Sequence, residues 1–163
     1  MYKVPISKIK IESKLAIIRE SILELEKIRE RYLKSFGFSE QFITDKNQFA
    51  IAEHYLRRAL ESVFDIGGHI ISRFSYSPAR RPKTFKEIAF ELGEKGVVDK
   101  KFAKDKLMEM AGYRNRLVHF YDEITAKELY QIIKKDLRDL EIFAQSVIKI
   151  IKNSKSVGLE ISD

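Results

Sequence analysis

The sequence has no cysteine, no tryptophan and only three prolines among its 163 residues. Without cysteine the chain can form no disulfide framework, no thiol nucleophile and no cysteine-ligated zinc site. No apolar run approaches the roughly 18 to 20 residues of a membrane-spanning helix, and the N-terminal stretch lacks the apolar segment of a signal peptide. These absences predict a cytoplasmic protein without membrane contact. The length predicts one domain over residues 1–152 and a polar tail over 153–163.

The charge is unevenly balanced. Lysine and arginine number 31 against 24 aspartate and glutamate residues, which gives a formal net charge of +7. A basic surplus is typical of proteins that bind nucleic acid. Many basic proteins bind none, so the charge favours an RNA or DNA partner without identifying one.

Apolar residues recur every three or four positions along most of the chain, which predicts amphipathic helices. The first predicted helix follows Pro5 and ends near Gly37, a natural helix stop. Its apolar stripe consists of Ile11, Leu15, Ile18, Ile22, Leu25 and Ile28. A run of phenylalanines follows, which we expect in the core rather than on an RNA-stacking surface: Phe36, Phe38, Phe42 and Phe49.

The second predicted helix begins near Thr44 or Asp45, either of which could cap it, and continues to about Arg73. It contains Gly67 and Gly68, which cost helix stability. We therefore expect a packing or kinking reason for this glycine pair.

Capping residues predict the remaining helices. Thr84 with Glu87 and Thr125 with Glu128 each form a capping-box pattern, and Asp99 can cap the helix between them. The last helix shows apolar residues at helical spacing from residue 129 to residue 150. No strand alternation persists, and the tail is expected to fray. The predicted fold is all-α, an up-and-down helical bundle with three long and two shorter helices.

The stretch "AGYRNRLVHFYDEIT", residues 111–125, concentrates polar groups at a predicted helix end. Arg114 and His119 are five residues apart, roughly 140° around a regular helix, so they cannot meet over one small substrate on an unbroken helix. Either the helix breaks near His119 or a second copy of the chain completes the site. The spacing thus favours a composite, dimeric site.

These groups match the needs of RNA cleavage without metal. Histidine carries protons near neutral pH, and the fork of Arg114 fits phosphate oxygens. Asn115 could orient the substrate or His119, and Tyr121 could stack on a base. The alternative is ordinary: an arginine and a histidine at a helix end are often surface residues or caps, and a tyrosine there often packs. Spacing alone leaves both interpretations open.

Arg114, His119 and Tyr121 form a motif in which four residues separate the first two and one residue separates the last two. This motif resembles that of the HepT toxins in the HEPN superfamily. The resemblance extends over about residues 8–150 and includes three stretches: "AEHYLRRALESVFDIGGHII", "TFKEIAFELGEKGVVDKKFAKDKLMEMAGYRNRLVHFY" and "DLEIFAQSVI".

This resemblance implies a HEPN-like bundle that dimerises and brings two motifs together in a cleft. It implies a metal-independent endoribonuclease that is the toxin of a toxin–antitoxin pair, with no cofactor. Arg114 and His119 would be catalytic, with Asn115 in support. The implied partner is an MNT-type nucleotidyltransferase antitoxin, which would silence the toxin by transferring AMP onto Tyr121. The family pattern fixes no role for Arg116, which we expect to contact RNA.

Glu61, Asp65 and His69 recur every fourth residue and could in principle bind a divalent metal. Metal sites in helical bundles usually take ligands from more than one helix, so we expect no metal here. The HepT-like pattern also has an acid at the position of Asp65. We expect Asp65 to face inward and support the site by pairing with an arginine of the motif helix. His69 is predicted to be a surface residue.

The loop "SPARRPK" supplies Arg80, Arg81 and Lys83, which are candidate contacts to RNA phosphates or simply a solvated surface. A different class of function also fits the whole chain. A non-catalytic helical module could dimerise and bind a nucleotide, or a nucleotidyltransferase, through the same residues. Loss of cell toxicity in Arg114→Ala and His119→Ala variants that still dimerise would distinguish the enzyme from this module.

Overall fold

The computed structural model describes residues 3–33, 42, 44–119 and 124–163, and its fold is all-α, as predicted. The helices are α1 (Lys8–Leu33), α3 (Lys46–Ile71), α4 (Phe85–Glu94), α5 (Lys100–Phe102), α6 (Met108–Val118), α7 (Ala126–Lys135) and α8 (Leu137–Lys152). Two 3₁₀ turns, η1 (Pro78–Arg80) and η3 (Ser154–Val157), and a π-helical segment, η2 (Ala103–Leu107), accompany them. Over the described residues, no helix is long and apolar enough to cross a membrane.

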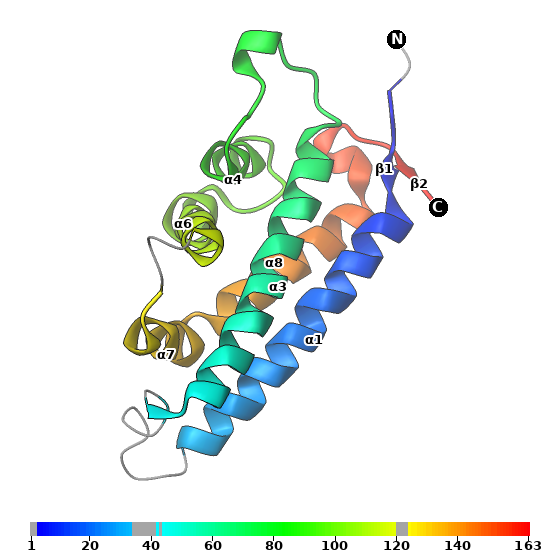
Figure 1. Ribbon diagram of the computed structural model, residues 1–163. Helices are drawn as coiled ribbons and strands as arrows, with labels where there is room; N and C mark the ends of the chain where they lie inside the picture. Colours follow the sequence, from blue (N-terminus) through cyan, green and yellow to red (C-terminus); the bar gives the residue numbers. More distant parts are fainter. Residues whose placement is uncertain (1–2, 34–41, 43, 120–123) are drawn as a thin grey trace.

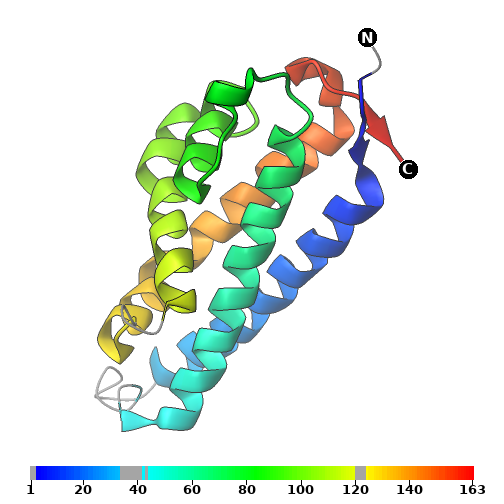
Figure 2. The same ribbon diagram turned by 45° about the horizontal axis from the view of Figure 1, so that its top comes forward.

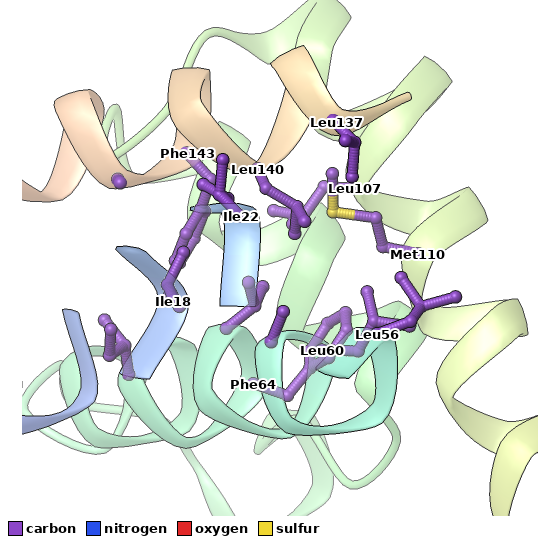
Figure 3. Close-up of a cluster of buried hydrophobic side chains, with 14 of the residues drawn as sticks. Ile18, Ile22, Leu56, Leu60, Phe64, Leu107, Met110, Leu137, Leu140 and Phe143 are labelled. Carbon is purple, nitrogen blue, oxygen red and sulfur yellow. The ribbon is translucent and has the colours of Figure 1, made fainter. Parts of the chain in front are cut away.

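Helix α3 lies at the centre of the arrangement and contacts α1, α4, α6, α7 and α8. In both views α1 lies on one side of α3, while α4, α6 and α7 lie along the other (Figures 1 and 2). Figure 3 shows the core between these helices, with side chains of α1, α3, η2, α6 and α8 directed toward one another. The labelled residues are Ile18, Ile22, Leu56, Leu60, Phe64, Leu107, Met110, Leu137, Leu140 and Phe143. All ten are buried.

The predicted caps are present. Asp45 accepts hydrogen bonds from the backbone N–H groups of the second and third residues after it, and Asp99 accepts one from the third residue after it. Complete capping boxes begin α4 at Thr84 and α7 at Thr125. Each cap satisfies N–H groups that a helix start leaves without partners.

Gly67 has a packing role, as the sequence suggested for the glycine pair. A Cβ atom at Gly67 would lie 3.0 Å from Leu92 Cδ1 and 3.2 Å from Ile88 Cγ2, both on α4. Since this is tighter than ordinary van der Waals contact, the missing side chain allows α4 to approach α3 closely.

The prediction of one long last helix is wrong. The chain bends at Asp136, which has φ −108° and ψ −1° and separates α7 from α8. Ile133 and Leu137 flank the bend, and both are buried. The apolar period therefore continues across a change of helix axis, which is why periodicity did not reveal it.

The prediction that the C-terminal tail frays is wrong. Strand β2 (Ile161–Ser162) pairs in parallel with β1 (Ile6–Ser7), and Leu159 is only 4% exposed. The Ile6 N–H donates to the carbonyl of Glu160 at 2.8 Å. Two-residue strands this far apart in the chain leave no alternation for sequence analysis to detect.

Candidate functional site

Helix α6 ends at Val118, and His119 is its C-cap in extended conformation, with φ −103° and ψ 117°. Of the two alternatives that the spacing left open, the helix break near His119 is present. The side chain of His119 therefore does not continue the face that a regular helix would give it. The residue is exposed.

His119 lines a cleft of about 340 Å³ between α3, the end of α6 and Ile124, which lies just before α7. The other lining residues are Phe49, Glu53, Arg57, Arg116, Leu117, Val118 and Ile124. Leu117 and Ile124 are buried and form apolar walls. An exposed histidine thus lies with two arginines in a hollow that is lined by both charged and apolar residues.

Arg114 does not line this cleft. Its guanidinium carbon lies 4.4 Å from the ring centroid of Phe85, the first residue of α4, in cation–π geometry. Its Nε is buried and has no hydrogen-bond partner among the described residues. Within one protomer the two predicted catalytic side chains therefore lie in different surroundings, and a shared site between two protomers stays a prediction. Asn115, next to Arg114, is half-buried, and Tyr121 lies outside the described residues.

Arg116 has a carboxylate partner. Its Nη1 and Nη2 donate to Oε1 and Oε2 of Glu128 at 3.1 and 2.8 Å, and this bidentate pair lowers the pKa of Glu128. Oε2 of Glu128 also accepts the Thr125 N–H at 3.1 Å. Arg116 therefore fastens the last turn of α6 to the first turn of α7, on either side of the segment that carries His119. Its predicted contact with RNA stays a prediction.

The predicted inward pairing of Asp65 is wrong. Its carboxylate bridges to Lys14 on α1 at 2.9 Å, and 52% of its side chain is exposed. Asp65 faces α1, whereas the motif arginines face α4 and α7. The partner of a helical acid depends on which neighbour packs against its face, which spacing along one helix does not show.

His69 is also corrected, because it is buried rather than on the surface. Its Nε2 accepts a hydrogen bond from the Ser7 N–H at 3.0 Å. Burial is the main cause that lowers its pKa, with Arg73 and Lys10 adding to the effect. Neutral His69 thus holds the start of α1, and no group of three potential metal ligands forms within the described ranges.

The basic loop lies apart from the cleft. Arg80, Arg81 and Lys83 are exposed. Arg80 borders a hollow with Phe90, and Arg81 borders another with Tyr76. Neither hollow includes His119, so contacts of this loop to RNA would lie outside the cleft.

Two residues of the cleft, Glu53 and Arg57, were not predicted from the sequence. With Phe49 they recur every fourth residue of α3, so they follow one face of that helix. This charged and aromatic stripe was the available signal. It became visible only when α6 was placed beside it, because nothing in the sequence pairs residue 57 with residue 119.

A family model described as "Ribonuclease HepT-like" matches residues 15–147. The chain belongs to this family. A HepT relative, the tRNA nuclease HepT of Aphanizomenon flos-aquae (strain 2012/KM1/D3), is 27% identical over 152 residues, which cover 92% of both chains.

Solved structures share the HepT-like fold. The tri-AMPylated HEPN toxin of Shewanella oneidensis, in complex with its MNT antitoxin, has a TM-score of 0.69 at 23% identity, covering 86% of this chain and 97% of that one. A toxin–antitoxin crystal structure with AMP-PNP also gives 0.69, at 22% identity and coverage of 86% and 98%. The cytosolic protein YutE of Bacillus subtilis, of unknown function, gives 0.72 at 21% identity, covering 94% and 95%.

Proposed function

We propose that this HepT-like protein is a metal-independent endoribonuclease that acts as the toxin of a toxin–antitoxin pair. The observation that carries the proposal is the position of His119, exposed at the end of α6 in a cleft, in a chain whose residues 15–147 match the ribonuclease family. The relative named a tRNA nuclease makes tRNA the first substrate to test.

The chemistry needs a proton removed from a ribose 2′-hydroxyl, a proton delivered to the departing 5′-oxygen, and positive charge on the phosphate. His119 transfers protons, and Arg114 stabilises the developing charge. The 2′-oxygen bonds to phosphorus as the 5′-oxygen leaves, so the products are a 2′,3′-cyclic phosphate and a 5′-hydroxyl. Because Arg114 stacks on Phe85 away from the cleft, we assign the arginine of each site to the second protomer of a homodimer.

We also propose an MNT-type nucleotidyltransferase as the antitoxin partner. Its support is the fold shared with a HEPN toxin that is AMPylated and bound to an MNT antitoxin. The phenol oxygen of Tyr121 would attack the α-phosphorus of ATP, losing its proton as pyrophosphate leaves. The added AMP places bulk and negative charge two residues from His119, where an RNA phosphate would have to bind.

The direct test incubates the purified protein with tRNA in EDTA and follows cleavage and product ends. We expect cleavage with 2′,3′-cyclic phosphate ends, lost in His119→Ala and Arg114→Ala. His54→Ala is the matched control, because His54 is an exposed histidine on α3 outside the cleft. Cleavage that disappears with the chelator would overturn the metal-free mechanism. No cleavage under any condition, from a folded dimer, would favour the binding module.

Mixing the two inactive variants tests the composite site. A heterodimer of Arg114→Ala and His119→Ala protomers retains one intact site if each site takes one residue from each protomer. Random mixing makes half of the dimers heterodimers, so we expect about a quarter of the wild-type activity to return. No recovery despite subunit exchange would place both residues of a site on the same protomer.

A further inference from the structure

The cleft beside His119 contains two arginines in different states. Arg116 donates two hydrogen bonds to Glu128, and 28% of its side chain is exposed. Releasing Arg116 for a ligand would break a bidentate pair in which Glu128 also caps α7. Arg116 is thus committed to holding the cleft together.

Arg57 is more available. Its side chain is 42% exposed, and its Nη2 donates to Oε1 of Glu53 at 3.0 Å, one turn earlier on α3. Its Nε is buried and has no hydrogen-bond partner within the part of the chain that the structure describes, so the exposed part of the guanidinium is what a ligand could reach. A half-exposed pair between residues four apart contributes little to stability, whereas a phosphate can accept two charge-assisted hydrogen bonds from one guanidinium. A phosphate that enters the cleft can therefore displace Glu53.

The surroundings of Arg57 suit a nucleotide. The cleft volume of about 340 Å³ is near the lower end of the roughly 300 to 1,000 Å³ of small-ligand pockets, so it accommodates about one nucleotide rather than a duplex. Phe49, on the same face of α3, packs partly against the core, as expected, but it also lines the cleft, so part of its ring can meet a base. Phosphate, base and proton-transfer contacts would then come from Arg57, Phe49 and His119 respectively.

We propose that Arg57 is a phosphate-binding residue for a single-stranded RNA segment in the cleft, and that Glu53 competes with the RNA for it. This inference rests on the proposed ribonuclease function and adds a residue from α3 to the site. Glu53 weakens RNA binding in the free protein because its carboxylate occupies Arg57 and repels the incoming phosphate.

The chain provides a matched control in the next residue, Arg58. Its side chain is 40% exposed and pairs with Glu20 at 3.6 Å, and its Nε is likewise buried without a partner among the described residues. Arg58 does not line the cleft. The variants Arg57→Gln and Arg58→Gln therefore remove the same charge from the same helix and differ in access to the site.

The experiment measures binding of a fluorescent single-stranded RNA oligonucleotide at several salt concentrations, with His119→Ala as the common background to prevent cleavage. We expect Arg57→Gln to weaken binding about tenfold and to reduce the slope of log K against log salt by about 0.7, the loss of one phosphate contact. Arg58→Gln should stay within about twofold, and Glu53→Gln should tighten binding. In the cleaving protein, Arg57→Gln should raise KM while Arg58→Gln leaves it unchanged.

Equal effects of Arg57→Gln and Arg58→Gln on affinity and salt slope would overturn the inference. Arg57→Lys guards against a folding artefact, because it keeps the charge and should preserve the salt slope while losing part of the bidentate affinity. A loss of the salt slope in Arg57→Lys, with an unchanged melting temperature, would also contradict a phosphate contact. These binding results stand apart from the proposed function, which is tested by whether the wild-type protein cuts RNA in EDTA.

Discussion

The two ends of the helical stretch 100–118, formed by α5, η2 and α6, hold neighbouring carboxylates in different environments, which shift their pKa values in opposite directions. Near its start, Lys106 lies 3.8 Å from a carboxylate oxygen of Asp136 and 3.7 Å from one of Asp139. Both acids are largely covered, with 22% and 14% of their side chains exposed. Burial raises the pKa of each, and the charge of Glu109 adds to this effect. Two covered carboxylates thus share Lys106 at this end, which we call the acidic end, and the raised pKa of each means that the nearby cations do not offset the cost of burying its charge.

At the other end, each glutamate beside the cleft has an arginine partner of its own, Arg57 for Glu53 and Arg116 for Glu128. Arg116 lowers the pKa of Glu128, and His119 and Arg57 lie in the same cleft. The same helical stretch therefore borders two different environments. At the acidic end the charged groups are largely covered, whereas at the other end His119 and Arg57 line an open cleft.

The largest expected effect separates activity from stability. His119→Ala should lower the rate of RNA cleavage by about 10² to 10⁴, the range for losing a general acid or base, and leave the melting temperature unchanged. Lys106→Met should do the reverse, because it leaves two covered carboxylates without their cation. Both are checked by cleavage rates at 25 °C and by thermal melting. A comparable loss of cleavage in folded Lys106→Met would show that the acidic end also serves catalysis.

The acidic end can also be disturbed from α4. A Cβ at Gly93 would lie 2.7 Å from Ala103 Cβ in η2, and neither atom can rotate away. We expect Gly93→Ala to lower the free energy of unfolding by about 1–3 kcal/mol through overpacking. Chemical denaturation measures this change. Gly68→Ala is the control, since its Cβ would lie 3.8 Å from Ile88 Cδ1, and it should gain up to about 1 kcal/mol of helix propensity. Destabilisation of equal size in both would contradict the packing argument.

Local chemistry made much of this fold predictable. Asp45, Thr84, Asp99 and Thr125 each cap the predicted helix, because a cap is a contact within three residues and the sequence displays both partners. The spacing of Arg114 and His119 left a helix break near His119 as one of two alternatives, and the helix does end there.

The errors share a physical cause. Asp65 pairs with Lys14, and His69 with the backbone of Ser7, so both depend on how α1 packs on α3. Arg57 belongs to the cleft only because α6 ends beside it. Contacts between elements distant in sequence follow from packing, which helical periodicity constrains to a face but not to a partner.

Removing one charge at the cleft end should lower the free energy of unfolding by less than Gly93→Ala does. Glu128→Gln keeps an acceptor for the capping box and removes the ion pair with Arg116. Because both side chains are partly exposed, we expect a loss of about 1 kcal/mol at neutral pH. The pKa of Glu128 is lowered in the fold, so its contribution is present above its ordinary pKa of 4.5 and is lost as the pH falls through the lowered value.

Urea denaturation of wild type and variant from pH 7 into the acid range measures this difference. Glu87→Gln is the control, because Glu87 has the same capping-box position at α4 and no ion-pair partner among the described residues. It should change stability little at any pH. An equal loss in both variants would assign the effect to capping rather than to Arg116.

The smallest expected effect is a gain rather than a loss in the free energy of unfolding, at Asp139. Since the pKa of Asp139 is raised, the folded protein binds its proton more readily than the unfolded chain does. Ionised Asp139 therefore costs stability at neutral pH, and the cost declines as the pH falls from the raised value toward the ordinary value near 3.8. Asp139→Asn removes this cost and leaves Lys106 paired with Asp136, so we expect a gain of about 0.5 kcal/mol at pH 7.

The gain of Asp139→Asn should disappear in acid, where the wild-type carboxyl is protonated. Denaturation curves over the same pH range as for Glu128→Gln measure it. Opposite signs at pH 7 for two carboxylate-to-amide changes near one helix would establish that Glu128 is compensated and Asp139 is not. A loss of stability in Asp139→Asn would instead mean that the bridge to Lys106 outweighs the burial of the charge, and the acidic end would then be as well compensated as the cleft.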